Sequence, residues 1–248
     1  MRKAIFLIAL APLLIFSACN KSTEDFKTAS LSDYYPFQVG KYVTYNLDSS
    51  VVYLNFGSSI VVINYQVKYA VDAQITDNLG RTAYRIIRYI RKTPADPWAP
   101  DNTFMAVPTE TSIEFIENNF RYLKMKLPIS EGYSWKGNSY IDTYSLNSTV
   151  KYLDDWDYTY DSLNVSAKIG TLTVDSTLKV SQRNEIIGNP SNPNSYSERN
   201  FSEEKYARGI GLVYRKFLHT EYQPPVPGHP GAFADASYGV TLTMIDHN

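Results

Sequence analysis

The sequence predicts a mainly β protein: a single domain of long antiparallel strands in a meander, curled as a barrel, a half-barrel or a sandwich. Three observations support this prediction. Tyrosine is abundant, with 21 residues among 248, and it is mixed with Val, Ile and Thr, which favour pleated, half-buried strands. Several segments alternate apolar and polar residues with period two. Turn-forming Asn, Asp, Gly and Pro residues separate them, and after the N-terminal segment no window shows the apolar stripe of an amphipathic helix.

The clearest strand covers residues 60–75. Apolar side chains such as Val61, Tyr65 and Val67 fall on one face, and polar ones such as Asn64 and Gln66 fall on the other. At about 3.3 Å per residue the segment would span roughly 50 Å, so we expect it to bend within a twisted sheet. Turn residues follow at 77–80, and residues 81–91 are expected to return as the next strand.

Later strands are expected in further alternating runs. Residues 113–116 and 121–125 form a predicted hairpin around Asn118 and Asn119, because Asn tolerates the left-handed conformation of tight turns. A helix over residues 109–120 is the competing interpretation. Further strands are predicted within 140–152, 172–180, 210–222 and 240–245, and proline-rich loops at 94–100, 188–193 and 224–231. Composition does not change between the two halves, which favours one domain.

The first residues have the pattern of a secretory signal peptide. Arg2 and Lys3 are basic, residues 4–16 are uncharged and apolar, and Ser17 and Ala18 are small. This apolar run is shorter than the roughly 20 residues that a helix needs to cross a bilayer. We expect a signal peptide over residues 1–18, a lipidated cysteine and flexible tether over 19–32, and a β domain over 33–248.

The stretch from Phe16 to Cys19 resembles the lipobox of bacterial lipoproteins, although leucine is more usual than phenylalanine at its start. Cys19 is the only cysteine in the sequence, so it has no disulfide partner in the chain. The resemblance implies that Cys19 carries lipid and anchors the protein to a membrane. Asn20 is not the aspartate that retains lipoproteins in the inner membrane, so we expect an outer membrane lipoprotein, periplasmic or surface-exposed. The alternative is an ordinary signal peptide that is cut nearby.

Three further segments resemble a broad set of uncharacterised Bacteroidota envelope lipoproteins. They are YYPFQVGKYVTY at 34–45, GYSWKGN at 132–138 with LPI at 127–129, and YARGIGLVY at 206–214. The resemblance implies an envelope β domain in which the first segment starts the folded body and the last forms a late hairpin. It implies no known activity and carries over no catalytic residue.

Composition and motifs narrow the function. The formal net charge is −1, without the basic surface that nucleic-acid binding requires, so we expect no nucleic-acid partner. The sequence has no HExxH, no phosphate-binding loop, no GxSxG and no cysteine nucleophile in the predicted domain. We therefore expect a protein that is not an enzyme and needs no cofactor. A hydrolase that uses paired carboxylates is the remaining enzymatic alternative.

Two tryptophans are the candidate ligand-binding residues. Trp98 lies in a proline-framed loop, and Trp156 lies among acidic residues. Such rings could stack on sugars or line an apolar cavity, while core packing is the structural alternative. Asp154, Asp155 and Asp157 are weak calcium candidates, because clustered carboxylates suit that ion. The glycine of a calcium-binding EF-hand loop is absent, so a solvated acidic edge is the alternative.

The three histidines, His219, His229 and His247, match no metal-binding spacing, and we expect them on the surface or in loops. Taken together, these observations predict a membrane-anchored lipoprotein with a non-catalytic binding or carrier domain. The expected partner is an apolar small molecule or an envelope protein, besides the membrane itself. The alternatives are a surface glycan-binding, adhesin-like module and a structural subunit of an envelope complex.

Overall fold

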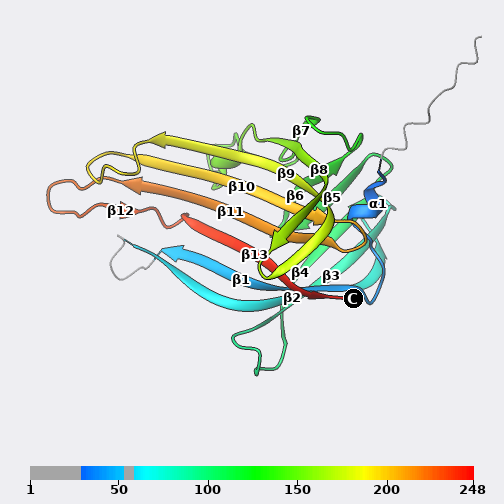
Figure 1. Ribbon diagram of the computed structural model, residues 1–248. Helices are drawn as coiled ribbons and strands as arrows, with labels where there is room; N and C mark the ends of the chain where they lie inside the picture. Colours follow the sequence, from blue (N-terminus) through cyan, green and yellow to red (C-terminus); the bar gives the residue numbers. More distant parts are fainter. Residues whose placement is uncertain (1–28, 53–58) are drawn as a thin grey trace, which may run out of the picture.

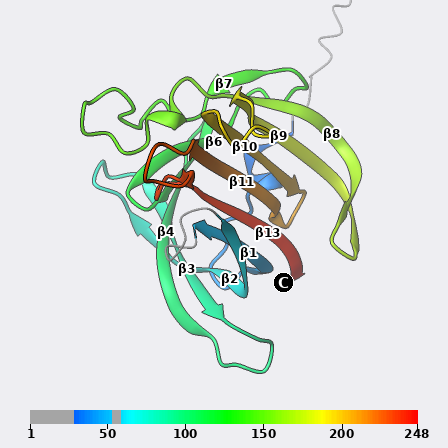
Figure 2. The same cartoon turned by 90° about the vertical axis from the view of Figure 1, so that its left-hand side faces the viewer.

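The computed structural model describes residues 29–52 and 59–248. The predicted signal peptide, Cys19 and most of the predicted tether lie outside the described residues. The described part forms one antiparallel sheet with the strand order β6-β5-β4-β3-β2-β1-β13-β11-β10-β9-β8-β7, and β12 pairs beside β11. The sheet curls until its two edges approach each other, as Figures 1 and 2 show. The prediction of a mainly β single domain of antiparallel strands is confirmed, and of the three expected shapes the sheet forms a nearly closed barrel.

The elements follow the chain in the order of their labels in Figure 1. They are α1 (Leu31–Tyr34), β1 (Tyr42–Val52), β2 (Ile60–Thr76), β3 (Thr82–Arg91), β4 (Ala99–Pro108), β5 (Ser112–Glu117), β6 (Phe120–Lys126), β7 (Ser134–Lys136), the 3₁₀ turn η1 (Lys151–Leu153), β8 (Asp157–Ile169), β9 (Leu172–Gly188), β10 (Ser197–Ala207), β11 (Gly211–Gln223), β12 (Ala232–Phe233) and β13 (Tyr238–His247). None of these helices is long and apolar enough to cross a bilayer.

The longest predicted strand is confirmed as β2, and it bends as its length requires. A bulge between Val71 and Ala73 shifts its pairing with β3. Such a bulge increases the local twist and lets a long strand follow a curved sheet. The hairpin of β5 and β6 is also confirmed. Asn118 and Asn119 occupy its turn with φ of 51° and 65°, so the alternative helix over residues 109–120 is wrong.

The barrel is nearly closed where β6 meets β7 and β8. The amide of Leu123 in β6 donates to the carbonyl of Gly137 at 2.8 Å, and the Trp135 indole donates to the Leu123 carbonyl at 2.7 Å. The Tyr160 hydroxyl also donates to the carbonyl of Lys126 at 2.9 Å. No β ladder joins these two edges of the described sheet. One backbone hydrogen bond and the side chains of Trp135 and Tyr160 therefore bridge two edges that no β ladder joins.

The predicted strand within residues 140–152 is wrong. The carboxylate of Asp142 accepts hydrogen bonds from the amides of Tyr144 and Ser145, and the Ser148 hydroxyl donates to the Asp142 carbonyl. These local bonds close turns and compete with strand pairing. Tyr144 and Leu146 are consequently exposed, at 81% and 93% of their surface. The alternation here did not reflect a buried face.

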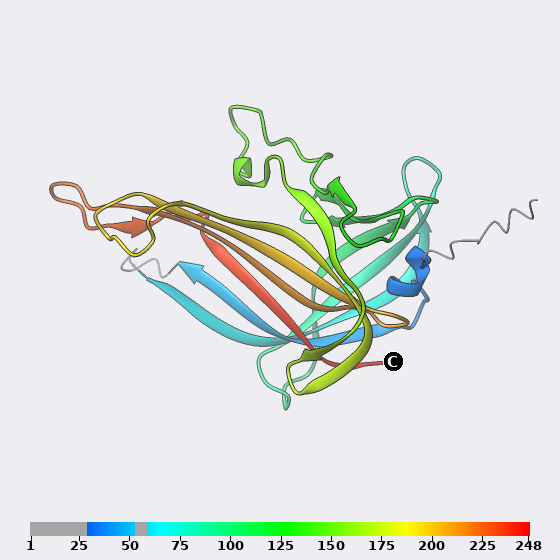
Figure 3. The same cartoon turned by 45° about the horizontal axis from the view of Figure 1, so that its top comes forward.

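We expected the folded body to begin at residue 33, but it begins a few residues earlier. Ser30 caps the short helix α1 with a capping box. Leu31 and Tyr34 of α1 are buried against the barrel. The chain enters the fold at the same end of the barrel as the C-terminus, opposite the loops that join β9 to β10 and β11 to β12 (Figures 1 and 3).

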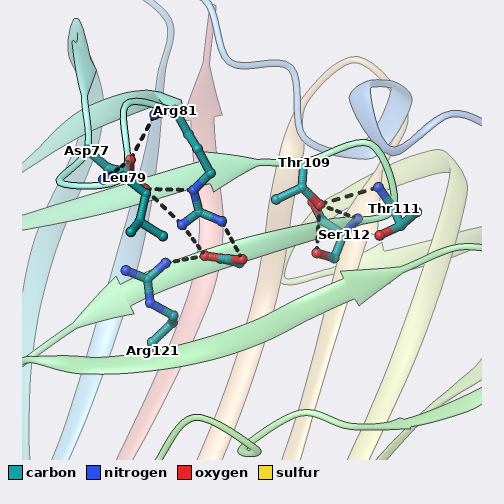
Figure 4. A network of polar contacts seen from close by, with 8 residues as sticks. Asp77, Leu79, Arg81, Thr109, Thr111, Ser112 and Arg121 are labelled. Carbon is teal, nitrogen blue, oxygen red and sulfur yellow. Dashed lines mark hydrogen bonds and ion pairs between the residues drawn. The ribbon is translucent and has the colours of Figure 1, made fainter.

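A salt-bridge network ties the turn between β2 and β3 to the hairpin of β5 and β6 (Figure 4). The guanidinium of Arg81 donates to both oxygens of Glu114 at 3.0 Å and to the carboxylate of Asp77 at 2.8 Å. Arg121 forms a further ion pair with Glu114. A bidentate arginine fixes direction as well as charge, so this network orients two hairpins that are distant in sequence.

Candidate functional site

A pocket of about 70 Å³ lies inside the barrel, between the segment that follows α1 and the inner face of the sheet. Its walls are largely aromatic and aliphatic, and they include Tyr35, Phe37, Val43, Tyr45, Tyr69, Val71, Ile86, Phe115 and Leu212. Lys41, Tyr42 and Asn248 line its outer part, at the end where the chain enters the fold. Apolar walls with a few polar groups are the usual composition of a small-molecule site.

The inner part of the pocket ends on a buried ion pair. The Nζ of Lys124 lies 2.6 Å from Oε1 of Glu204, and their side chains are only 5% and 1% exposed. The other carboxylate oxygen of Glu204 accepts hydrogen bonds from Gln182 at 2.8 Å and from the Tyr206 hydroxyl at 2.6 Å. These residues come from β6, β9 and β10, so the pair spans the interior of the barrel.

A second ion pair extends the cluster. Arg215 of β11 lies 2.7 Å from the carboxylate of Glu117, at the end of β5. The Nε of Arg215 lies 3.7 Å from Glu204, too far for a hydrogen bond. Among the described residues, this is the one fully buried side-chain nitrogen or oxygen without a hydrogen-bond partner. Two cations and two carboxylates therefore balance in charge, although their hydrogen bonding is incomplete.

The surroundings decide the protonation states of this cluster. Burial alone would raise the pKa of Glu204, but the charges of Lys124 and Arg215 outweigh it and hold that pKa below its usual range. The pKa of Glu117 is lowered in the same way, mainly by Arg215 against the effect of burial. Burial raises the pKa of Tyr206 well above its usual value, so its hydroxyl stays protonated. Burial lowers the pKa of Lys124, against the opposing charge of Glu204, whereas the charges of Glu117 and Glu204 outweigh burial and raise the pKa of Arg215.

Lys124 has hydrogen-bonding capacity to spare. An ammonium carries three N–H donors, and the only described hydrogen bond of Lys124 Nζ is the one to Glu204. The side chain also lines the pocket. It can therefore donate to an acceptor on a bound molecule without leaving Glu204. Because buried ion pairs seldom add stability, such a pair beside a pocket is a candidate functional group.

Trp98 lies directly before β4, on the outside of the sheet rather than in the pocket. Its ring is partly exposed. The guanidinium of Arg91 lies 4.2 Å from the ring centroid, and Nζ of Lys68 lies 5.2 Å from it. These cation–π contacts occupy part of the ring surface that a sugar would need. A ligand-binding role for Trp98 stays a prediction.

Trp156 does not present a surface to a ligand. Its side chain is only 1% exposed, its indole donates to the carbonyl of Tyr152 at 2.7 Å, and its ring stacks near Phe217 at 6.0 Å between centroids. The predicted ligand-binding role of Trp156 is therefore corrected to core packing. Its acidic neighbours in the sequence point outward, while the ring points into the barrel.

The acidic residues around Trp156 hold lysine rather than an arrangement suited to calcium. Lys136 lies 2.6 Å from Asp155 and 2.9 Å from Asp157, and Asp154 accepts a hydrogen bond from Thr143. Within residues 29–52 and 59–248, no group of three or more acidic, histidine or cysteine side chains is placed to hold a metal ion. The weak calcium prediction at Asp154, Asp155 and Asp157 is corrected to an acidic edge in which Lys136 pairs with Asp155 and Asp157.

The pocket residues were not predicted from the sequence, although one signal was present. In β11, Arg215 falls between Val213 and Phe217 on the apolar face. In β10, Glu204 lies in phase with buried Ser202 and Tyr206. A charged side chain on the buried face of a strand needs an opposite charge beside it, so its position in the alternation indicates an internal ion pair. The partner could not be identified, because Lys124 lies 80 positions away from Glu204.

Comparisons with known proteins identify no family for this chain. No family model matches the chain, and no curated protein matches it. One similar solved structure is that of a protein of Bacteroides fragilis that is predicted to be exported and has a YmcC-like fold. It is 9% identical, with a TM-score of 0.39, and the alignment covers 84% of this chain and 97% of that one.

Proposed function

We propose that this protein is an envelope lipoprotein, anchored through Cys19 to the outer membrane, that binds one end of a small amphiphile in the barrel pocket. The supporting observation is an apolar pocket that ends on the buried pair of Lys124 and Glu204. The binding is non-catalytic in this proposal. The sequence predicted an apolar ligand, and the proposed ligand carries a polar group in addition to its apolar part.

The volume limits what can enter. A water molecule needs about 10–15 Å³ of such space, so about 70 Å³ holds roughly five waters or a similar number of ligand atoms. A whole lipid chain does not fit. The ligand therefore places only its polar end, with a few adjoining carbon atoms, inside the pocket. The spare donors of Lys124 favour a hydrogen-bond acceptor such as a carbonyl, carboxylate or hydroxyl oxygen.

The position of the pocket supports a membrane source for this ligand. Asn248 at the C-terminus lines its outer part, and the C-terminus lies at the same end of the barrel as helix α1 in Figure 3. Residues 19–28 can reach at most about 35 Å when fully extended, at about 3.3–3.6 Å per residue. A lipid on Cys19 would therefore hold the pocket end near the bilayer. An amphiphile in that bilayer would have a short path to the pocket.

Filling the pocket tests the proposal. Val43 of β1 lines the pocket, and a Val43→Trp substitution would occupy its space. Val62 of β2 is 58% exposed, so Val62→Trp is the matched control. Binding of short- and medium-chain fatty acids and monoacylglycerols would be followed by native mass spectrometry and by thermal shift. We expect both signals in the wild type and in Val62→Trp, and neither in Val43→Trp.

No bound amphiphile in the wild type, or equal binding in both tryptophan variants, would contradict the proposed pocket function. The anchor is tested separately by a Cys19→Ala substitution. We expect the variant to lose processing and lipid labelling and to change its membrane fractionation. Unchanged labelling and fractionation would refute the proposed anchor while leaving the pocket result intact.

A further inference from the structure

A second, polar site lies farther along the inner face of β9, β10 and β11, toward the end of the barrel away from α1. Asn200 shares its face of β10 with Glu204, because side chains alternate along the strand. The groove here has a volume of about 560 Å³, within the usual range for small-molecule sites. Its floor is two rows of cross-strand neighbours: Glu185, Asn200 and His219, then Ile187, Glu198 and Glu221.

The hydrogen bonds of Asn200 fix the state of His219. The Asn200 amide nitrogen donates to Glu185 at 3.1 Å and to Glu198 at 2.7 Å, so its oxygen must be the atom that faces His219. That oxygen lies 2.8 Å from Nδ1 of His219. Because an amide oxygen only accepts, Nδ1 carries the proton. In the neutral ring, Nε2 is therefore an acceptor with a free lone pair.

This lone pair is open to the groove. His219 is only 2% exposed, and its ring stacks on Tyr152 at 3.7 Å between centroids. No described residue forms a hydrogen bond with Nε2. In the described chain, Arg215 Nε is the one side-chain nitrogen or oxygen that is fully buried and lacks a hydrogen-bond partner. Since His219 Nε2 also lacks a partner, it is not fully buried. The expected surface histidine is instead a buried ring whose free nitrogen reaches the groove that it lines.

The charges of the groove are unbalanced in a way that stability does not explain. Glu198 and Glu221 are direct cross-strand partners, and like charges in that position are destabilising. Within residues 29–52 and 59–248, no salt bridge reaches Glu198, Glu221 or Asp154, each of which lines the groove. The charged side chains along the groove are Lys151, Asp154, Asp155, Arg183, Glu185, Glu198 and Glu221. Asp155 pairs with Lys136 and Glu185 pairs with Arg183, so among the described residues Asp154, Glu198 and Glu221 are left without an ion pair beside the single unpaired cation Lys151.

We propose that this groove binds a small organic cation with several N–H donors, namely a linear polyamine. Its ammonium groups would neutralise Glu198 and Glu221 and donate a hydrogen bond to Nε2 of His219. A metal ion suits the groove less well, because the described side chains include no group of three or more placed to hold one. Neighbouring strands are about 4.8 Å apart, so the two carboxylates can contact one chain of amines.

Spermidine binding to the purified full-length protein in neutral detergent, measured by isothermal titration calorimetry at physiological ionic strength, tests the proposal. The test variant is the double substitution Glu198→Gln and Glu221→Gln. The control is Glu131→Gln, which removes one carboxylate at an exposed position outside the groove. We expect the double variant to weaken binding about tenfold or more and the control to leave it unchanged.

A stability measurement separates binding from folding. Because the double substitution removes a like-charge pair, its thermal unfolding midpoint should equal or exceed that of the wild type. Weaker binding with an unchanged or higher midpoint supports the site. Failure of the wild type to bind spermidine overturns the proposal, and so does equal binding by all three proteins. A lower midpoint in the double variant would also count against it, because the two glutamates would then be structural.

The pH dependence gives a second readout. Burial lowers the pKa of His219 below its ordinary value of 6.5, so Nε2 stays unprotonated at neutral pH. Besides the charged groups already named along the groove, Tyr152 and Tyr238 lie nearby, and burial raises the pKa of both. Spermidine affinity should fall only as the pH drops through this lowered pKa, since a protonated ring repels the ligand. Unchanged affinity at a pH where NMR shows the His219 ring to be protonated would overturn the role of His219.

Discussion

Two buried carboxylates illustrate how the same ion pairing has different consequences in two regions of the barrel. Glu114 lies on the opposite face of β5 from Phe115 and pairs with Arg81 and Arg121, whose side chains are 31% and 25% exposed. Glu204 lies inside the barrel and pairs with Lys124, which is 5% exposed. If its carboxylate is lost, an outer arginine can turn toward water, whereas the inner lysine cannot. The inner pair is therefore the costlier one to break.

The largest expected effect is that of Glu204→Gln. It leaves the Lys124 ammonium buried beside a neutral amide, and we expect the free energy of unfolding to fall by about 3–5 kcal/mol. The matched substitution Glu114→Gln should cost about 1–3 kcal/mol, because its arginines remain partly solvated. Urea denaturation monitored by circular dichroism measures both. Equal losses for the two variants would remove the distinction between the regions.

A double-mutant cycle makes the comparison sharper. Lys124→Met combined with Glu204→Gln should show an interaction energy of about 1–3 kcal/mol, because each charge is expensive only when the other is missing. The cycle of Arg121→Met with Glu114→Gln should give less than about 1 kcal/mol, as is usual for partly exposed pairs. A larger value for the outer pair would mean that exposure does not govern these energies.

The pH dependence of stability should also follow the inner cluster. Because the pKa values of Glu204 and Glu117 are lowered in the folded protein, their contribution is present above the ordinary glutamate value of 4.5. It is lost as the pH falls below that value through the folded pKa. Unfolding free energies across this range should therefore decline less steeply in Glu204→Gln than in the wild type. If the unfolding free energies of the two proteins decline equally with pH, the ionised form of Glu204 adds nothing to stability.

The smallest expected effect is on the outer surface of the sheet, at Trp98. Its described cation contacts are with Lys68 and Arg91 in the neighbouring strands, and an exposed cation–π contact is worth about 0.5–1 kcal/mol. Trp98→Ala should lower the unfolding free energy by no more than a similar amount. The same variant tested on a glycan array checks the alternative of sugar binding. Wild-type binding that Trp98→Ala abolishes would support that role, and a blank wild-type array would end it.

The confirmed parts of the fold are those that depend on local pattern. The alternation over residues 60–75 needs only side-chain direction to predict a strand, and this strand is β2. The turn at Asn118 and Asn119 needs only their tolerance of positive φ. The predicted strand within residues 140–152 failed because Asp142 bonds its neighbouring amides. Alternation alone does not distinguish a buried face from an exposed loop with tyrosine and leucine side chains.

The candidate sites depend on distant contacts, which explains why sequence reasoning missed them. Lys124 and Glu204 meet only because β6 and β10 face each other across the curled sheet. His219 was assigned to the surface or a loop because a lone histidine matches no motif. Its partner Asn200 acts through the register of β10 and β11, which no local pattern reveals. Trp156 was misjudged because its acidic neighbours suggested exposure.

The sequence by itself determined several strands, among them β2, β3, β5 and β6, and the turn between β5 and β6, because each depends on residues close together along the chain. The lipoprotein leader stays a prediction. Only the tertiary structure decided which charges share the interior, which tryptophan is buried and which histidine nitrogen is open. Burial and pairing in a curled antiparallel sheet are set by strand order and register. These quantities are sums over contacts between residues that lie tens to hundreds of positions apart.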